Sequence, residues 1–313
     1  MEKILIAGGT GYIGSEAVQA ALKLNYEVFV LTRSTETAEK LRSIGVEPIV
    51  GDLYEENGEW QEVAKKVDYA TFIASPPTWG KKVTKKVALN FQQGHKEMTQ
   101  RFLHAFENTD VKKVVYIAGT SYFGDAGDQK PQTESMRAEP KGWGPYIAPS
   151  VRLLPTYISK GIPLVIAFPG QVYGPASWLP QLYLEPIYRG KVVNRLKGYN
   201  PLNSPIHVED CGRAIVHLLA EGKSGESYLL IDDEPVPSDV LQMAIAESMN
   251  KELKYREVPK WLCSLLIGPV LTDYATAHTN FSNGKLKETG FEFLYPTYKD
   301  GIPDVVKTWL DRQ

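Results

Sequence analysis

Three glycines near the start of the chain, Gly8, Gly11 and Gly14, have a spacing that suits the binding of a diphosphate group. They follow directly on the apolar run KILIA. In a strand-turn-helix unit of this kind, one glycine permits the tight turn, one lets backbone amides approach the phosphates, and one lets the helix pack closely on the strand. The diphosphate then lies at the positive N-terminus of the helix. The pattern therefore predicts a dinucleotide site; its alternative is a glycine-rich turn of another α/β protein.

The end of the next apolar segment, residues 27–33, indicates which dinucleotide binds. A site that prefers NAD has Asp or Glu there, which accepts hydrogen bonds from the adenosine ribose. This chain has Thr32 and Arg33. Without the carboxylate a 2′-phosphate is not repelled, and a guanidinium can pair with it and stack on the adenine. The sequence therefore favours NADP over NAD; the alternative is that Arg33 is a solvated residue after a strand.

Regular elements must hold these residues, and strand and helix patterns alternate along the chain as far as residue 168. Strands are predicted over residues 3–7, 27–33, 46–50, 68–74, 113–118 and 163–168. Helices are predicted after the glycine turn and over residues 38–44, 58–67 and 146–160. A further long helix carries an apolar stripe, which we interpret as core and not as cofactor contact: Val87, Phe91, Gly94, Met98, Phe102 and Phe106. The alternation predicts an α/β fold with a Rossmann-type doubly wound parallel sheet.

Beyond residue 168, proline and glycine become frequent and the patterns shorter, which is typical of a smaller lobe that covers a substrate. We therefore expect an NADP-binding domain over residues 1–175 and a smaller C-terminal α/β substrate lobe over residues 176–313, with an approximate, interleaved boundary. Helices are predicted at 210–221 and 238–250, capped by Glu209 or Asp210 and by Ser238. The apolar stretch 261–271 is too short to span a bilayer and predicts a buried helix or a lid over a pocket.

Composition excludes several classes of protein. The 313 residues are 43% hydrophobic, which is enough for a sizeable core, and the formal net charge of −2 gives no electrostatic case for nucleic acid. Two cysteines, Cys211 and Cys263, suggest neither a disulfide framework nor a metal site. Polar residues lead straight into the first strand, so we expect no signal peptide, no membrane partner and a cytoplasmic location.

Six motifs in order resemble the extended and atypical short-chain dehydrogenase/reductase superfamily, which contains nucleotide-sugar epimerases, dehydratases and dihydroflavonol-type reductases. The resemblance covers nearly the whole chain. The motifs lie at residues 8–14, 51–53, 89–94, 120–124, 169–175 and 206–210.

The resemblance implies that Asp52 contacts the adenine and that the backbone at residues 73–76 lines the nicotinamide ribose. It also implies pairing of two copies through the long helices, so a homodimer is possible. The cofactor-binding residues that we predict are Gly8, Thr10, Gly11, Tyr12, Ile13, Gly14, Thr32, Arg33, Asp52, Leu53, Ala74, Ser75, Pro76, Ser150, Pro169 and Val172.

The chain departs from the superfamily at the catalytic positions. The superfamily uses a Ser or Thr that orients the substrate oxygen, a Tyr that moves the proton, and a Lys four residues later. The position of the usual hydroxyl falls on Gly119, with Thr120 and Ser121 immediately after it. Tyr146 matches the tyrosine, but Ser150 stands where the lysine belongs. Ser150 shares a helix face with the tyrosine and could touch the ribose, yet it supplies no charge. We predict Tyr146, Thr120 and Ser121 as catalytic residues.

Three functions follow from that departure. The first is an NADPH-dependent reductase of a carbonyl or activated double bond in a small organic substrate, because reduction needs only a protonated donor. The second is an NADP-binding sensor or regulatory protein without turnover. The third is a nucleotide-sugar epimerase or dehydratase, which begins with an oxidation and so needs a competent base. The polar segment 120–145 is expected to pass over the nicotinamide pocket, with Trp143 contacting the substrate or closing the site.

Overall fold

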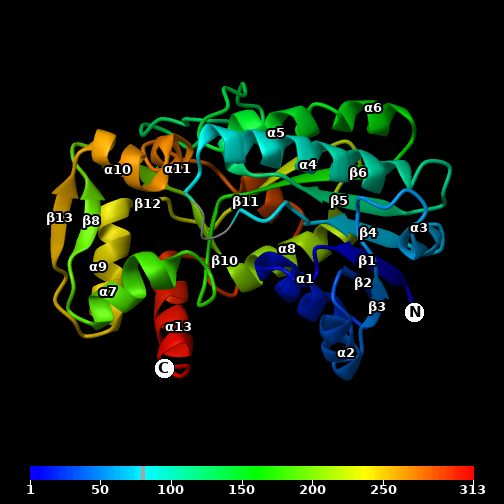
Figure 1. Ribbon diagram of the computed structural model, residues 1–313, viewed down its shortest axis with the longest axis horizontal. Helices are drawn as coiled ribbons and strands as arrows, with labels where there is room; N and C mark the ends of the chain where they lie inside the picture. The colour runs from blue at the N-terminus through cyan, green and yellow to red at the C-terminus, as the bar shows by residue number, and fades with distance from the viewer. Residues whose placement is uncertain (79–81) are drawn as a thin grey trace.

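A parallel sheet forms the larger unit of the protein, in the half of the molecule that carries the N-terminus (Figure 1). The computed structural model describes residues 1–78 and 82–313. Within them, seven strands follow the order β11-β6-β5-β4-β1-β2-β3. Their bounds are β1 (Lys3–Ala7), β2 (Glu27–Thr32), β3 (Glu47–Val50), β4 (Tyr69–Phe72), β5 (Lys113–Ile117), β6 (Leu164–Pro169) and β11 (Ser227–Leu230). The order reverses direction between β1 and β4, where a crevice opens beyond the carboxyl ends of the strands. The predicted doubly wound α/β fold is confirmed.

Helices cover both faces of the sheet, and successive strand residues point to opposite layers. Leu5 and Ala7 of β1 pack in the layer formed by α3 (Glu59–Ala64), α4 (Lys85–His104), α5 (Gly144–Val151) and α6 (Leu154–Ser159). Ile4 and Ile6 pack in the opposite layer, beneath α1 (Tyr12–Lys23), α2 (Thr35–Ser43), α8 (Val208–Glu221) and α12 (Gly284–Lys287). Packing on both faces holds the carboxyl ends of the parallel strands together at one edge of the sheet.

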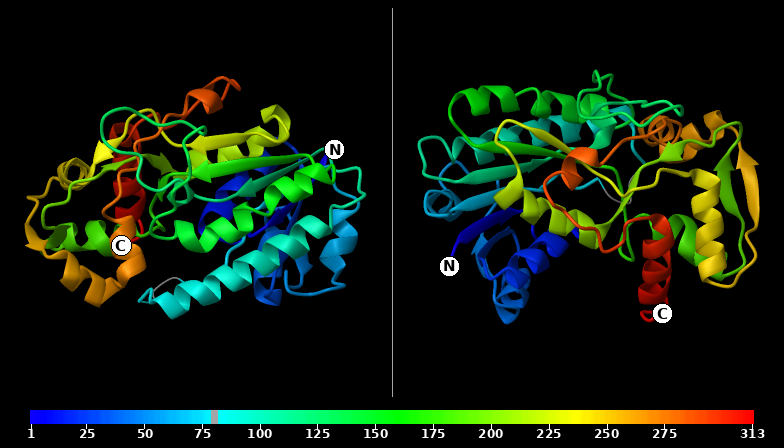
Figure 2. Two further views of the ribbon diagram at one scale, coloured as in Figure 1. Left: turned by 90° about the horizontal axis from the view of Figure 1, so that it is seen from above. Right: turned by 180° about the vertical axis from the view of Figure 1, so that it is seen from behind.

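The smaller lobe has its own core at the far end of the molecule (Figure 2). It contains the π-helical segment η2 (Pro180–Leu184), α7 (Glu185–Tyr188), α9 (Ser238–Ser248) and α13 (Tyr298–Leu310). Three short strand pairs frame it: β7 (Gln171–Tyr173) with β10 (Pro205–His207), β8 (Val193–Leu196) with β13 (Tyr255–Val258), and β9 (Leu202–Asn203) with β12 (Val236–Pro237). The remaining elements are the 3₁₀ turn η1 (Thr120–Tyr122), α10 (Lys260–Ile267) and α11 (Pro269–Tyr274).

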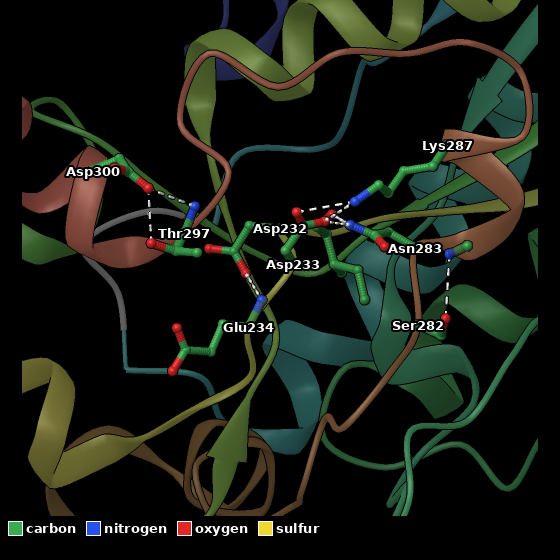
Figure 3. A network of polar contacts seen from close by, with 10 residues as sticks. Asp232, Asp233, Glu234, Ser282, Asn283, Lys287, Thr297 and Asp300 are labelled. Atoms are coloured by element: carbon green, nitrogen blue, oxygen red, sulfur yellow. Dashed lines mark hydrogen bonds and ion pairs between the residues drawn. The ribbon is translucent and has the colours of Figure 1, made fainter.

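The two units interleave along the chain. After β10 the chain returns to the large unit, where α8 packs along α1 and β11 pairs with β6 at the edge of the sheet. The loop after β11 then ties the units together. Asp233 binds Lys287 and the Asn283 amide beside α12 of the large unit, and Asp232 accepts a bond from the amide of Glu234 (Figure 3). Glu234 in turn accepts bonds from Lys299 on α13 of the smaller lobe. Asp232 is 2% exposed, and this burial raises the pKa of its carboxyl to about 9.

Several predicted element boundaries were wrong. The helix expected over residues 146–160 is two helices, α5 and α6, because Pro155 has no amide hydrogen to continue the ladder. The cap of α8 is His207, whose Nδ1 accepts from the amide of Glu209, so the predicted caps Glu209 and Asp210 are wrong. Asp210 instead accepts two backbone bonds, from the amides of residues 294 and 295.

Two further expectations for the smaller lobe were also wrong. Ser238 does not cap α9, because it is the first helical residue and its hydroxyl accepts a bond from the Asn203 amide group. For the stretch 261–271 the alternative of a buried helix is wrong, because α10 (Lys260–Ile267), which covers most of it, has no buried residue. Trp261 is 69% exposed there. The alternative of a lid over a pocket stays a prediction. In the part of the chain that the structure describes, no helix has both the length and the apolar composition to cross a membrane.

Candidate cofactor and active site

A cavity of about 390 Å³ opens at the carboxyl ends of β1 to β4, at the point where the strand order reverses. We call it the β1–β4 cavity. Thirteen of the sixteen predicted cofactor residues line it: Gly8, Thr10, Gly11, Tyr12, Ile13, Gly14, Thr32, Arg33, Asp52, Leu53, Ala74, Ser75 and Pro76. The structure thus brings together residues from four separate segments of the sequence, although their contact with a cofactor stays a prediction.

The glycine turn has the shape that a diphosphate needs. Gly8 has φ +94°, which an L side chain rarely adopts, and a Cβ there would lie 2.6 Å from the amide nitrogen of Ala74. A Cβ on Gly14 would overlap the carbonyl oxygen of Gly8. The amide of Gly11 donates to that same carbonyl (3.0 Å), and α1 begins one residue later. The unpaired amides of the first turn of α1 therefore face the cavity, where they suit an anion.

The end of the cavity beside β2 and β3, where the adenosine is predicted to bind, carries one cation and one anion. Arg33 Nη1 lies 3.9 Å from Asp52 Oδ2, and the Arg33 side chain is 68% exposed. Thr32 is buried, and its hydroxyl accepts a bond from the amide of Ser34. Ser34 in turn caps α2 through the amide of Thr37. The turn after β2 is therefore held by its own hydrogen bonds, while the guanidinium remains free to reorient toward a ligand.

Ile73 of the predicted 73–76 backbone segment also lines the cavity, and five lining residues were not predicted: Leu31, Gly51, Tyr54, Pro77 and Met98. A Cβ on Gly94 would lie 2.5 Å from the Tyr54 hydroxyl. The glycine of the 89–94 motif was therefore a signal that another side chain packs closely against the helix at this point. Met98 was interpreted as core only, and this was wrong in part. It is 8% exposed, packs in the core and also borders the cavity. Helical periodicity shows which face points inward, but not where the inner face meets a cavity.

Three predicted cofactor residues lie outside the lining of this cavity. The carbonyl of Val172 accepts a bond from Trp178 Nε1 (3.0 Å), and Pro169 ends the buried strand β6. Ser150 has no exposed surface, and its Oγ lies 2.8 Å from His95 Nδ1. The hydroxyl of Ser150 is thus engaged within the protein, and its predicted contact with the ribose has no support in this geometry.

Ser150 belongs to a buried polar cluster that links α4, α5 and β5. His95 is 5% exposed, and burial lowers the pKa of its imidazole to about 4. The Thr99 hydroxyl donates to the backbone carbonyl of His95 and also lies 2.9 Å from the Tyr116 hydroxyl. Burial raises the pKa of Tyr116 well above its usual range. At neutral pH the cluster is therefore uncharged, in contrast to the cation that the superfamily places at this position.

The predicted catalytic hydroxyls lie close to the start of α5. A Cβ built on Gly119 would lie 3.8 Å from Ser121 Oγ and 3.9 Å from Ile147 Cδ1. Ser121 is thus the hydroxyl nearest to the usual position, and its backbone carbonyl accepts a bond from the amide of Lys141. Thr120 is 2% exposed, and its side chain is enclosed by the protein.

Tyr146 lies in a second hollow, of about 450 Å³, between the N-terminal ends of α4 and α5 and the segment that contains α10 and α11. We call it the Tyr146 hollow. The tyrosine is half-buried and packs with Val83, Ala88 and Val270. The ring centroids of Trp143 and Tyr146 are 6.4 Å apart, and the Trp143 ring also packs against Phe91 in a tilted arrangement. Trp143 is half-buried, and its contact with a substrate stays a prediction.

The fold and the cavity define a member of the extended short-chain dehydrogenase/reductase superfamily. The NAD dependent epimerase/dehydratase family matches residues 4–230, and the chain belongs to that family. NAD(P) is its typical cofactor, and the glycine cradle and the cavity fit a dinucleotide.

Relatives and solved structures are similar over most of the chain. A ketoreductase of 4-hydroxy-2-methyl-3-oxo-4-farnesyl-3,4-dihydroquinoline-1-oxide from Stigmatella aurantiaca is 24% identical over 82% of this chain and 76% of its own. The UDP-glucose 4-epimerase of Thermus thermophilus, solved with NAD, has a TM-score of 0.80 at 20% identity, covering 98% of this chain and 99% of that one. The UDP-glucuronic acid 4-epimerase of Bacillus cereus has a TM-score of 0.81 at 18% identity, with 99% of each chain covered.

Proposed function

We propose that the protein is an NADP(H)-dependent reductase that acts on a carbonyl or activated double bond of a small organic substrate, with Tyr146 as the proton donor. The β1–β4 cavity carries this proposal, because Arg33 stands at its adenosine end where an NAD site has a carboxylate. A 2′-phosphate can replace Asp52 as the partner of the guanidinium, since the existing pair is long and exposed. The similarity to a ketoreductase agrees with reduction as the reaction.

In the proposed reaction, the β1–β4 cavity binds the cofactor, and Ser121 and Tyr146 act on the substrate. When bound, NADPH supplies a hydride to the substrate. The Ser121 hydroxyl donates a hydrogen bond to the substrate oxygen, and the Tyr146 hydroxyl donates the proton that completes reduction. This direction needs a neutral phenol, so the uncharged Ser150–His95 cluster is compatible with it. An epimerase must first oxidise its substrate, and a cluster without a cation gives the tyrosine no help as a base.

A second candidate function is an NADP-binding sensor without turnover. One observation favours it: the side chain nearest to the Gly119 position, apart from Ser121, is the apolar Ile147. In this case the cofactor binds in the β1–β4 cavity and changes the conformation or the partners of the protein.

The experiment that separates these functions is a titration with NADPH and with NADH, followed by cofactor-oxidation assays on aldehydes, ketones, enones and sugar nucleotides. Tighter binding of NADPH and its consumption with one of the first three classes is the result we expect. Tight binding without consumption on any substrate would favour the sensor. Conversion of a sugar nucleotide without net change in the cofactor would contradict both.

A further inference from the structure

The Tyr146 hollow shares no lining residue with the β1–β4 cavity and has a different character. The two adjoin through α4, where Phe91 packs against Trp143 and Gly94 lies beside Pro76 of the cavity. Its walls come from α4, α5, α10, α11 and the segment just before α5, which lie together at one end of the helical layer (Figure 1). At about 450 Å³ it is large enough for a small organic molecule. Much of its wall is apolar, as at Pro145, Pro269 and Val270.

Lysines dominate the charge of the hollow. Lys85, Lys141 and Lys260 line it, against a single carboxylate, Asp273. Two of the lysines are already paired: Lys260 Nζ lies 3.2 Å from Asp273, and Lys141 Nζ lies 2.9 Å from Asp125. Among residues 1–78 and 82–313, Lys85 has no carboxylate within 4 Å of its ammonium group. Lys85 can therefore pair with a negatively charged group of a ligand.

The backbone adds to this field. Lys85 is the first residue of α4, Tyr146 lies in the first turn of α5, and Lys260 is the first residue of α10. Three helices of eight or more residues thus begin at the hollow, and each places the positive end of its dipole there. The helix ends reinforce the charge of the lysines, and together they disfavour a cationic ligand.

We propose that the Tyr146 hollow binds a monoanionic, otherwise apolar organic acid, with its acid group at Lys85 and its body against the apolar wall beside the Tyr146 hydroxyl. This inference names the substrate class of the reductase proposed above and rests on that function. The substrate is then a keto acid or an unsaturated acid, not a neutral ketone or a sugar nucleotide with two phosphates.

Binding can be tested without turnover by fluorescence titration with two matched probes. 1-Anilinonaphthalene-8-sulfonate is an apolar monoanion, and N-phenyl-1-naphthylamine has the same rings without the sulfonate. We expect Lys85→Glu to weaken the binding of the anionic probe about tenfold or more, since a charge-assisted contact becomes a repulsion. The neutral probe should bind both proteins equally. Saturating NADP⁺ is included in parallel titrations to occupy the β1–β4 cavity.

Lys86→Glu is the matched control, because Lys86 is the exposed neighbour of Lys85 on α4 and does not line the hollow. It should leave the binding of the anionic probe unchanged. Lys260→Gln provides a second variant of the wall and should weaken anionic binding to a smaller extent. Equal losses for Lys85→Glu and Lys86→Glu, or equal losses for both probes, would overturn the proposal.

The same proteins distinguish this inference from the reductase itself. If the function holds, Lys85→Glu should raise KM for a keto acid and leave KM for its methyl ester unchanged. Selective binding of the anionic probe with no NADPH consumption on any acid would contradict the reductase while leaving the anion site established. Turnover of the neutral ester with no preference for the acid would contradict the substrate class alone.

Discussion

The β1–β4 cavity and the Tyr146 end of α5 have kept the features of their family to different degrees. In the cavity, the backbone requires glycine for steric reasons that any dinucleotide site of this shape shares. Gly8 has a positive φ, and Gly14 leaves room for the Gly8 carbonyl. Near the start of α5, Gly119 and Ser150 stand where the resemblance to the family implies side chains that carry chemistry. The difference shows that binding shape depends on backbone, which cannot change without disturbing the fold, whereas catalysis depends on a few side chains that can.

Ser150 shows how such an exchange is accommodated. Its hydroxyl bonds to His95, and this pair lies against the sheet with Tyr116 and Thr99 nearby. The position is therefore part of a close-packed polar core and not an empty place left by a lost lysine. Ser150 fits here without exposed surface because His95 packs and hydrogen-bonds with it.

The largest expected effect is at Tyr146. Tyr146→Phe removes only the proposed proton donor, so we expect turnover to fall by about 10²–10⁴-fold and NADPH binding to be unchanged. The measurements are steady-state kinetics on the best substrate and a fluorescence titration of NADPH. Tyr188→Phe is the control, because Tyr188 is exposed in the smaller lobe. Undiminished turnover of Tyr146→Phe would show that the hydroxyl is not the donor.

Restoring the lysine of the superfamily tests whether the α5 end can be returned to the usual chemistry. Ser150→Lys places a charge in a position without exposed surface and beside a neutral imidazole. We expect the free energy of unfolding to fall by roughly 3 kcal/mol or more, with no gain in turnover. Urea unfolding and kinetics check both. Ser159→Lys, an exposed site on α6, should change stability by less than about 0.5 kcal/mol. Faster turnover in Ser150→Lys would mean that the position still reaches the active site.

His95 gives the same region a measurable pH dependence. Its pKa is lowered to about 4 in the folded protein, while an unfolded histidine titrates near 6.5. The unfolded chain therefore binds a proton that the folded protein does not, and stability falls as the pH drops from about 6.5 to about 4. Above pH 6.5 the penalty vanishes. The full effect is on the order of 3 kcal/mol.

The difference between wild type and His95→Gln isolates this term from the titrating carboxylates. We expect the variant to lose less stability between pH 7 and pH 4 in urea unfolding. His104→Gln is the control, since the His104 side chain is 75% exposed, and its pH profile should match that of the wild type. A profile of His95→Gln parallel to the wild type would show that the imidazole is protonated in the folded state.

The sequence predicted the large unit well because local patterns determine it. Apolar runs gave the strands of the sheet through β6, and the glycine turn gave the cavity at β1. Strand β11 and helix α13 were not predicted, although α13 has a capping box at Thr297 and Asp300. A strand near the end of the chain that joins the edge of the first sheet depends on a long-range pairing, which periodicity does not encode.

The α5 end was less predictable for a different physical reason. Helical spacing predicted that Tyr146 and Ser150 lie on one face of the helix, as the structure has them. It did not predict which residues pack against that face. The partner of Ser150 is His95, 55 positions away on α4, and only packing reveals it. The two boundaries of the Tyr146 hollow likewise come from segments more than a hundred residues apart, Lys141 and Lys260.

The smallest expected effect concerns Arg33 and tests the cavity rather than the α5 end. Arg33→Gln removes the charge that we assign to a 2′-phosphate, so we expect NADPH to bind about tenfold more weakly and NADH to bind equally well. Because the pair with Asp52 is long and exposed, the stability of the protein should be unaffected. Arg42→Gln, an exposed arginine on α2, is the control. If Arg33→Gln weakened both cofactors alike, the guanidinium would serve the adenine and not the phosphate. The preference of the cavity for one cofactor would then depend on its backbone alone. The cavity, like the Tyr146 end of α5, would lack the side chains that determine function.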